Sequence, residues 1–235
     1  MKRIIISDTH IGTKFYKSEE LLAFLHQIEC DELILAGDII DFIKIPVFTE
    51  RCLQILKKMG EAKRVVYVVG NHDEGLVGVV GKQVMGIEFM KRYDFEENGR
   101  KFRVEHGDQY DKGALANRVF VKFLSVIQNI LEFSFNFDFT TWWTEIQIKK
   151  HKLRSIINIL RHHPKIDVFI MGHLHIPEAL IWVDENQVIK TYINSGDWVT
   201  HQTYVSVTEG IARLRKFKVP EGHQDMLLDV ADDHV

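Results

Sequence analysis

Five short polar motifs stand where apolar runs of the sequence end: "DTH", "GDIID", "GNHDE", "HGD" and "GHLH". Together they supply carboxylates, imidazoles and one amide. This mixture of oxygen and nitrogen donors suits Mn, Fe, Co, Ni or Zn better than Ca or Mg. We expect the metal ligands to be Asp8, His10, Asp38, Asn71, His106, His173 and His175. A metal-dependent reaction is therefore the first chemistry that these residues indicate.

The spacing within two of the motifs supports this interpretation. Asp8 and His10 are two residues apart, and so are His173 and His175. Alternate residues of an extended segment point to the same side, so each pair could direct two ligands to one site or to adjacent sites. Alone, "DTH", "GD" and "HGD" are weak signals, and "GNHD" and "GHLH" are more specific, because a buried imidazole or amide needs a partner. Their joint order, each after an apolar run, is the specific signal.

The elements that must position these motifs are short strands and helices. Helical apolar spacing predicts helices over 19–28 and 47–59, the second just after Pro46. Strands that alternate with helices favour a parallel sheet, and ligands collect beyond the carboxyl ends of its strands. The strands expected before the motifs cover 4–7, 32–36, 64–69, 101–105 and 167–171.

The rest of the chain divides into further core, an insert and a tail. Glycines mark a loop-rich stretch after Gly75, and later strands are expected at 179–183, 188–193, 204–207 and 210–217. Long helices are expected over 113–139 and 142–161. We therefore predict a core formed by 1–111 and 164–220, a helical insert over 112–163 and an acidic, flexible tail over 221–235.

The insert is rich in aromatic residues, and two interpretations of it stay open. Six phenylalanines lie between residues 120 and 139, and Trp142 and Trp143 follow. A helical hairpin could pack these side chains in a core of its own. Alternatively, the insert is a lid for acyl chains or a surface that meets a membrane or a second subunit.

Composition bounds the remaining possibilities. The 235 residues carry a net charge of −3 at pH 7, so the electrostatic signature of a dedicated nucleic-acid-binding protein is missing. Cys30 and Cys52 do not have the spacing of a metal site, and we expect reduced thiols. The N-terminal apolar run is too short for a signal peptide. A cytoplasmic protein is therefore expected.

The order of the five motifs resembles that of the calcineurin-like metallophosphoesterase superfamily. The resemblance implies an α/β fold of four layers, in which a β-sandwich is flanked by helices, here with a helical insertion. It also implies two divalent metal ions, with Asp38 bridging them. One ion would bind Asp8, His10, Asp38 and His175, and the other Asp38, Asn71, His106 and His173. The implied activity is hydrolysis of phosphoesters or pyrophosphates.

Four further residues receive roles beside the ligands. The resemblance makes His72 a catalytic proton donor to the leaving oxygen, or a clamp on its charge. Asp73 is placed to orient that imidazole. Asp41 is either an acceptor for a ligand histidine or the N-cap of a helix near Ile45. Asp108 has the same two possible roles, and the acceptor behind a ligand is favoured.

The segments "GHLHIPE" and "YINSGDWVT" resemble the UDP-2,3-diacylglucosamine pyrophosphatase-like subgroup, whose enzymes act in lipid A synthesis. This implies a nucleotide-linked lipid as substrate, with Asn194 and Trp198 near it, and a position peripheral to the inner membrane. The chain departs from the subgroup at His72, where an arginine is usual, and at Glu74, where an aromatic residue is usual. A phosphodiesterase or nuclease, or a scaffold without turnover, are the alternatives.

Overall fold

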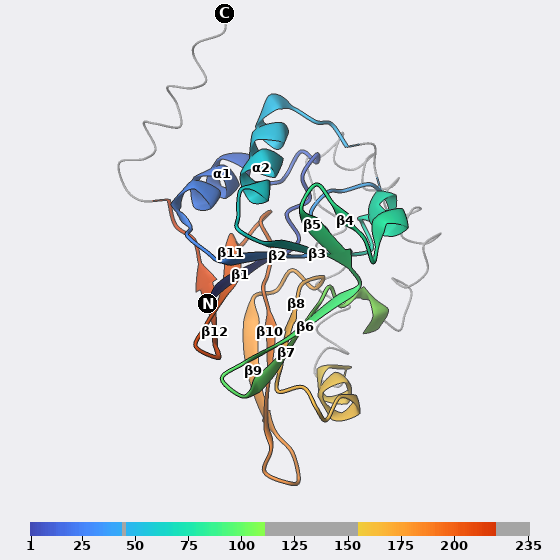
Figure 1. Ribbon diagram of the computed structural model, residues 1–235, viewed down its shortest axis with the longest axis vertical. Coiled ribbons are helices and arrows are strands. Elements are labelled where there is room, and N and C mark those ends of the chain that lie inside the picture. The colour runs from blue at the N-terminus through green and yellow to red at the C-terminus, as the bar shows by residue number, and fades with distance from the viewer. Residues whose placement is uncertain (44–45, 111–154, 220–235) are drawn as a thin grey trace, which may run out of the picture.

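The computed structural model describes residues 1–43, 46–110 and 155–219, which form two β-sheets and the helices outside them (Figure 1). The first sheet has the order β12 (Ile211–Lys216), β11 (Thr203–Thr208), β1 (Lys2–Ile6), β2 (Glu32–Ala36), β3 (Val65–Val68), β5 (Ile87–Met90) and β4 (Gln83–Val84). The second has the order β6 (Arg92–Glu97), β7 (Arg100–Glu105), β8 (Val168–Met171), β10 (Ile189–Asn194) and β9 (Glu178–Val183).

Alternation along the central strands builds two apolar layers at once. In β1, Ile4 and Ile6 face α1 (Ser18–Gln27) and α2 (Glu50–Gly60), whereas Ile5 faces the second sheet. Strands β2 and β3 repeat this pattern. Because successive side chains of a strand point to opposite faces, a continuous apolar run is what a doubly covered strand requires.

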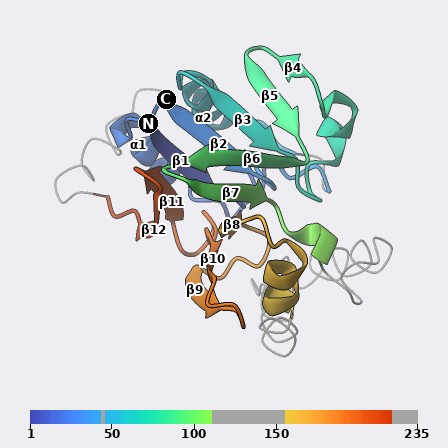
Figure 2. The same cartoon turned by 60° about the horizontal axis from the view of Figure 1, so that its bottom comes forward.

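A further layer covers the outer face of the second sheet. Residues 155–162 are helical, and Ile156, Ile159 and Leu160 pack with Phe169 and Tyr192 of that sheet. In Figures 1 and 2 this helix lies beside β8, on the far side of the sandwich from α1 and α2. The expected α/β sandwich of four layers is confirmed.

Parallel pairing fixes where the polar motifs must lie. Strand β2 pairs in parallel with both β1 and β3, and β8 pairs in parallel with both β7 and β10. The carboxyl ends within each trio therefore lie at one edge of their sheet. Every predicted ligand follows one of these ends.

Some boundaries differ from the expectations. Helix α2 begins at Glu50 rather than at residue 47, because Thr49 is its N-cap and accepts from the backbone N–H of Cys52 at 3.3 Å. The stretch after Gly75 was expected to be a loop but contains a 3-10 helix, η1 (Glu74–Val79), and strands β4, β5 and β6. Its glycines obscured these short elements, although Tyr93 and Phe95 alternate as a strand requires.

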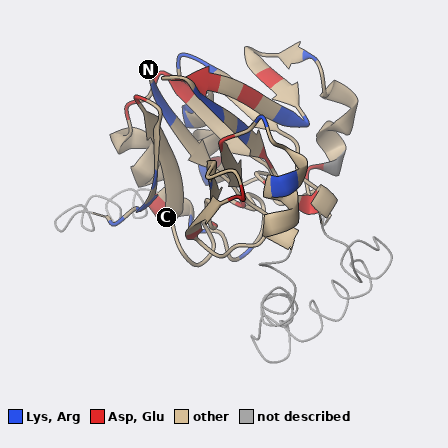
Figure 3. Ribbon diagram, turned by 90° about the horizontal axis from the view of Figure 1, so that it is seen from below, with Lys and Arg blue, Asp and Glu red and all other residues tan. Residues whose placement is uncertain are grey.

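Other predictions are tested only in part. Both cysteines are free thiols, as expected. The predicted helix over 113–139 and the tail over 221–235 lie outside the described residues, and so does most of the insert. Within the described parts of the chain, no helix is long and apolar enough to span a bilayer. Basic and acidic residues are interspersed along the strands in Figure 3, and pairs such as Arg103 and Asp94, 2.7 Å apart, join them.

Candidate metal centre

The seven predicted ligands converge where the carboxyl ends of the two sheets meet. Six of them form two groups of three. Within each group, the three ligand atoms lie within 4.8 Å of one another. The first group is Asp8, His10 and His175, and the second is Asp38, His106 and His173. Each group takes residues from loops of both sheets, so the ligand sets bridge the sandwich.

The first group is centred on the carboxylate of Asp8, which is fully buried. His175 Nε2 lies 3.2 Å from Asp8 Oδ1, and His10 Nε2 lies 3.3 Å from His175 Nε2. The backbone N–H of His173 donates to Asp8 Oδ2 at 3.0 Å. One carboxylate and two imidazole nitrogens thus face a common point.

The second group is centred on Asp38 and His106. His106 Nε2 lies 3.1 Å from Asp38 Oδ2 and 3.1 Å from the amide oxygen of Asn71. His106 Nδ1 lies 3.0 Å from the carbonyl oxygen of Ala36. A carbonyl only accepts, so Nδ1 must donate, and Nε2 is the nitrogen directed into the site. This orientation is typical of a metal-binding histidine.

The backbone is strained at five of the seven ligands. Asp8, His10, Asp38, His173 and His175 have φ values of 50°, 48°, 54°, 66° and 55°. This left-handed region costs a residue with a side chain roughly 1–2 kcal/mol. Strain of this kind persists at functional sites, where the surrounding structure over-determines the backbone.

Three glycines make room for the ligands. A Cβ at Gly172 would lie 2.3 Å from Asp8 Oδ2, and one at Gly70 would lie 2.3 Å from Asp38 Oδ1. A Cβ at Gly37 would lie 2.3 Å from His106 Nδ1. Each of these glycines directly precedes one candidate ligand, and its Cβ would overlap a different one. A side chain at any of the three positions would therefore displace a ligand.

The donor set fits divalent metal ions. Carboxylate and imidazole donors are arranged in compact groups. The hydrogen bond from His106 Nδ1 to Ala36 leaves Nε2 unprotonated in the neutral ring, as a metal ligand requires. Asp38 falls in only one of the two groups, so the shared position implied by the resemblance stays a prediction.

His72 borders both groups, with its ring centroid 4.8 Å from that of His10, and Asp41 lies close to it. His72 Nδ1 lies 3.2 Å from Asp41 Oδ1, and His72 Nε2 lies 3.8 Å from Asp38 Oδ2. The other oxygen of Asp41 lies 3.5 Å from His10 Nδ1. Asp41 faces both histidines, and its Oδ1 also accepts from the backbone N–H of Ile43 at 3.0 Å, whereas the N-cap of α2 is Thr49.

The role predicted for Asp73 is wrong. Its carboxylate is fully buried and points beneath the loop, where it accepts from the hydroxyl of Tyr67 at 2.7 Å and from the backbone N–H groups of Asp38 and Gly70 at 2.7 and 2.9 Å. Asp73 thus ties two ligand turns together instead of orienting His72. Tyr67 was not predicted, although a hydroxyl inside the run "RVVYVV" was a visible signal.

The predicted substrate contacts Asn194 and Trp198 are also wrong, because both are fully buried. Asn194 donates to the carbonyl oxygen of Gly172 at 2.6 Å and accepts from the N–H of Gly196 at 2.9 Å. The Trp198 ring packs on Phe24, with 4.7 Å between the ring centroids. These residues support the loops behind the ligands.

Burial and charge act against each other on the ionisable groups. Burial alone would lower the pKa of His106, but the carboxylates of Asp38, Asp8 and Asp108 outweigh it and raise this pKa to about 10. Burial likewise opposes a charged His72, and Asp38 and Asp41 raise its pKa to about 9. Asp108, at the start of η2 (Asp108–Tyr110), thus acts on His106 through its charge, and its predicted hydrogen bond stays untested.

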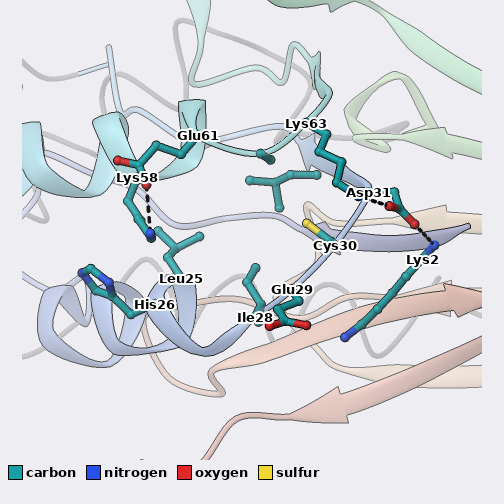
Figure 4. A pocket seen from close by; sticks show the side chains of 12 residues that line it. Lys2, Leu25, His26, Ile28, Glu29, Cys30, Asp31, Lys58, Glu61 and Lys63 are labelled. Carbon is teal, nitrogen blue, oxygen red and sulfur yellow. Dashed lines mark hydrogen bonds and ion pairs between the residues drawn. The ribbon is translucent and has the colours of Figure 1, made fainter.

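A separate hollow of about 530 Å³ lies at the other end of the strands, next to the C-terminal ends of α1 and α2 (Figure 4). Its charged side chains pair with one another. Lys63 lies 2.8 Å from Asp31, and Lys58 lies 2.8 Å from Glu61. The hollow has no part in the metal centre.

Comparison with known proteins gives this centre its class. The family model described as calcineurin-like phosphoesterase matches residues 1–177. The chain therefore belongs to the calcineurin-like phosphoesterase family, and it is a phosphoester hydrolase. The resemblance inferred from the five motifs is confirmed.

The chain is also similar to individual proteins of known name or structure. A UDP-2,3-diacylglucosamine hydrolase of Porphyromonas gingivalis is 23% identical over 250 residues, which cover 84% of this chain and 90% of the relative. Among solved structures, Vps29 of Chaetomium thermophilum matches with a TM-score of 0.50 and 10% identity, covering 94% of this chain and 89% of its own. A metallophosphoesterase of Sphaerobacter thermophilus matches with a TM-score of 0.47 and 15% identity, covering 98% and 94%. The structural matches concern the fold alone.

Replacing Gly172 by alanine tests how tightly the ligands are enclosed. The new methyl group would overlap Asp8 Oδ2 and lie 2.5 Å from Ser7 Oγ, so we expect Gly172→Ala to lose most of its bound metal. Gly78→Ala is the matched control, because a Cβ there meets nothing within 4 Å. Elemental analysis and circular dichroism measure metal content and folding. Full metal content in Gly172→Ala would contradict the enclosure.

The stability of the metal-stripped protein should depend on pH. The fold raises the pKa of His106 from 6.5 to about 10, so the folded state binds this proton more tightly than the unfolded state does. The resulting stabilisation is complete below a pH of about 6.5 and is lost as the pH rises towards about 10. We expect the Tm of stripped protein to fall over this range. Mn²⁺-loaded protein is the control, since a bound ion replaces the proton. Parallel profiles would contradict the expectation.

Proposed function

We propose that this chain is a dinuclear metal-dependent hydrolase whose substrate is a UDP-linked lipid, with UDP-2,3-diacylglucosamine as the favoured candidate. The observation that carries the metal-dependent reaction is the pair of adjacent ligand groups with His72 at their border. The lipid assignment is supported by the motifs "GHLHIPE" and "YINSGDWVT" and by the relative from Porphyromonas gingivalis.

Seven side chains would hold the two ions. We assign Asp8, His10 and His175 to one ion and Asn71, His106 and His173 to the other, with Asp38 shared. Two divalent ions, when bound, stabilise the attacking and leaving oxygens of an in-line displacement and lower the pKa of a bound water. Mn²⁺ is the favoured ion, and the same donors also suit Fe, Co, Ni or Zn.

His72 would act on the leaving oxygen. Asp41 lies 3.2 Å from His72 Nδ1 and would orient the imidazole, so that Nε2, 3.8 Å from Asp38, could face the substrate. A quarter of the His72 side chain is exposed (25%), so a substrate can reach it. His72 would hold a proton at Nε2 and donate it as the phosphorus–oxygen bond breaks.

Two proposals concern the surroundings of the enzyme. A lipid-linked substrate implies work at the cytoplasmic side of the inner membrane, so we propose a cytoplasmic enzyme in peripheral contact with it. The apolar insert over 112–163 is the segment proposed for that contact or for self-association, on the basis of its sequence alone.

Direct assay tests the substrate. Mn²⁺-loaded protein should release UMP from UDP-2,3-diacylglucosamine and should also cleave bis(p-nitrophenyl) phosphate. Cleavage of the second compound without UMP release would remove the lipid assignment and leave the enzyme class. Strong cleavage of single-stranded DNA that is lost in Asn71→Ala would favour a nuclease. Absence of turnover together with fewer than about one metal ion per chain would favour the scaffold.

Replacing His72 tests whether this residue is a general acid or a metal ligand. We expect His72→Ala to lower kcat by about 10²–10⁴-fold, as for the loss of a general acid, with metal content unchanged. Asp38→Ala should lower both. His26→Ala is the matched control, because His26 lies in the hollow at the other end of the strands. A loss of metal in His72→Ala as large as in Asp38→Ala would show that His72 is a ligand.

A further inference from the structure

The loop over residues 195–202 lies at the metal centre and carries His201, which has no role in the proposed reaction as described above. Residues 195–202 join β10 of the second sheet to β11 of the first. Strand β10 lies beside β8 in parallel, with Asn194 opposite Met171, so this loop leaves the same sheet edge as His173 and His175. It therefore borders the candidate ligands.

Two hydrogen bonds hold the loop against the first ligand group. The backbone N–H of Trp198 donates to the carbonyl oxygen of Asp8 at 3.1 Å. The hydroxyl of Ser7 donates to the carbonyl oxygen of Gly196 at 3.1 Å. The loop thus borders Asp8, whereas His72 lies beside His10, Asp38 and Asp41.

Asp197 organises the loop and the imidazole of His201 together. Its side chain is buried, and Oδ1 accepts from the backbone N–H groups of Val199 at 2.8 Å, of Thr200 and of His201. Oδ2 lies 2.5 Å from His201 Nδ1. One oxygen is therefore sufficient to close the turn, and the other is left to orient the imidazole.

His201 has one ring nitrogen left for a ligand. About a third of its side chain is exposed (34%), whereas that of Asp197 is 1% exposed. Since Nδ1 donates to Asp197, Nε2 is the ring nitrogen that remains for another partner, and it can accept. A surface histidine with no role would not need a buried carboxylate to hold it, because ordering a side chain costs entropy.

We propose that His201 is a substrate-contacting residue whose Nε2 accepts a hydrogen bond from a hydroxyl of the group that stays on the reacting phosphorus. Asp197 is its positioning residue. The inference rests on the proposed hydrolase function and deepens it. His72 would serve the leaving oxygen, and His201 would serve the retained group from the loop beside Asp8. A nucleoside offers ribose hydroxyls as donors, whereas a p-nitrophenyl group has no hydroxyl.

The test compares two substrates in three variants: His201→Ala, His201→Gln and Asp197→Asn. We expect His201→Ala to raise the KM for UDP-2,3-diacylglucosamine about tenfold, the effect of one lost hydrogen bond. Hydrolysis of bis(p-nitrophenyl) phosphate should stay within about twofold, because its retained group offers no partner. Asp197→Asn should raise the same KM, since the amide NH2 facing Nδ1 favours the tautomer with its proton on Nε2, which cannot accept from a hydroxyl. His201→Gln should recover part of the loss.

Controls separate a contact from a structural support. Metal content and Tm should match those of the wild type in His201→Ala, because Asp197 Oδ1 closes the loop without the imidazole. A KM unchanged for both substrates would overturn the proposal. A loss of metal or a lower Tm in His201→Ala that accounts for the activity change would also overturn it.

A second readout keeps the inference apart from the substrate assignment. If wild-type protein does not cleave UDP-2,3-diacylglucosamine, the proposed substrate is wrong. The role of His201 is then judged by calorimetric binding of UMP to the Mn²⁺-loaded protein. Affinity that is about tenfold weaker in His201→Ala supports the contact, and equal affinity overturns it.

Discussion

The structure depends on the pairing of two buried carboxylates with the histidines and backbone amides around them. Asp8 and Asp38 are almost completely shielded from solvent. A carboxylate removed from water costs several kcal/mol unless opposite charges and hydrogen-bond donors surround it. The backbone N–H of His72 donates to Asp38 at 2.8 Å, and that of His173 donates to Asp8 at 3.0 Å. Every other feature of the centre maintains this pairing.

The two sheets share that task, so the sandwich is more than a support. Each ligand group joins residues from both sheets, and its distances therefore depend on how one sheet packs on the other. The contact is made by close-packed apolar side chains, among them Ile5 and Ile34 of the first sheet and Val104 and Ile170 of the second. Such interiors transmit small displacements instead of absorbing them. A change between the sheets would thus alter both ligand groups.

The sequence was sufficient to predict the fold class and the convergence of the ligands. Parallel strands end at a common edge, so ordered polar motifs after apolar runs translate directly into a site. It was insufficient for the direction of side chains within loops. Asp73 follows His72 and Asp41 lies about 30 residues before it, yet Asp41 contacts the imidazole. Asn194 and Trp198 were misassigned for the same reason, because a position near a motif does not indicate which side of a turn faces the solvent.

The strained ligand turns explain why the supporting contacts are so numerous. Five ligand residues adopt this left-handed region, and each of them costs the folded state free energy. Hydrogen bonds must offset this strain, and the backbone supplies several. The N–H of Asp8 donates to the carbonyl oxygen of Gly37 at 3.0 Å, and the N–H of His10 donates to the backbone carbonyl oxygen of Asp38 at 3.0 Å. Asp73 adds its bond to the N–H of Asp38. Since ligands that bind only the folded state stabilise it, metal binding would offset the strain further. The fold therefore holds the donors in place before the ions arrive, and the ions return part of the stability that this arrangement costs.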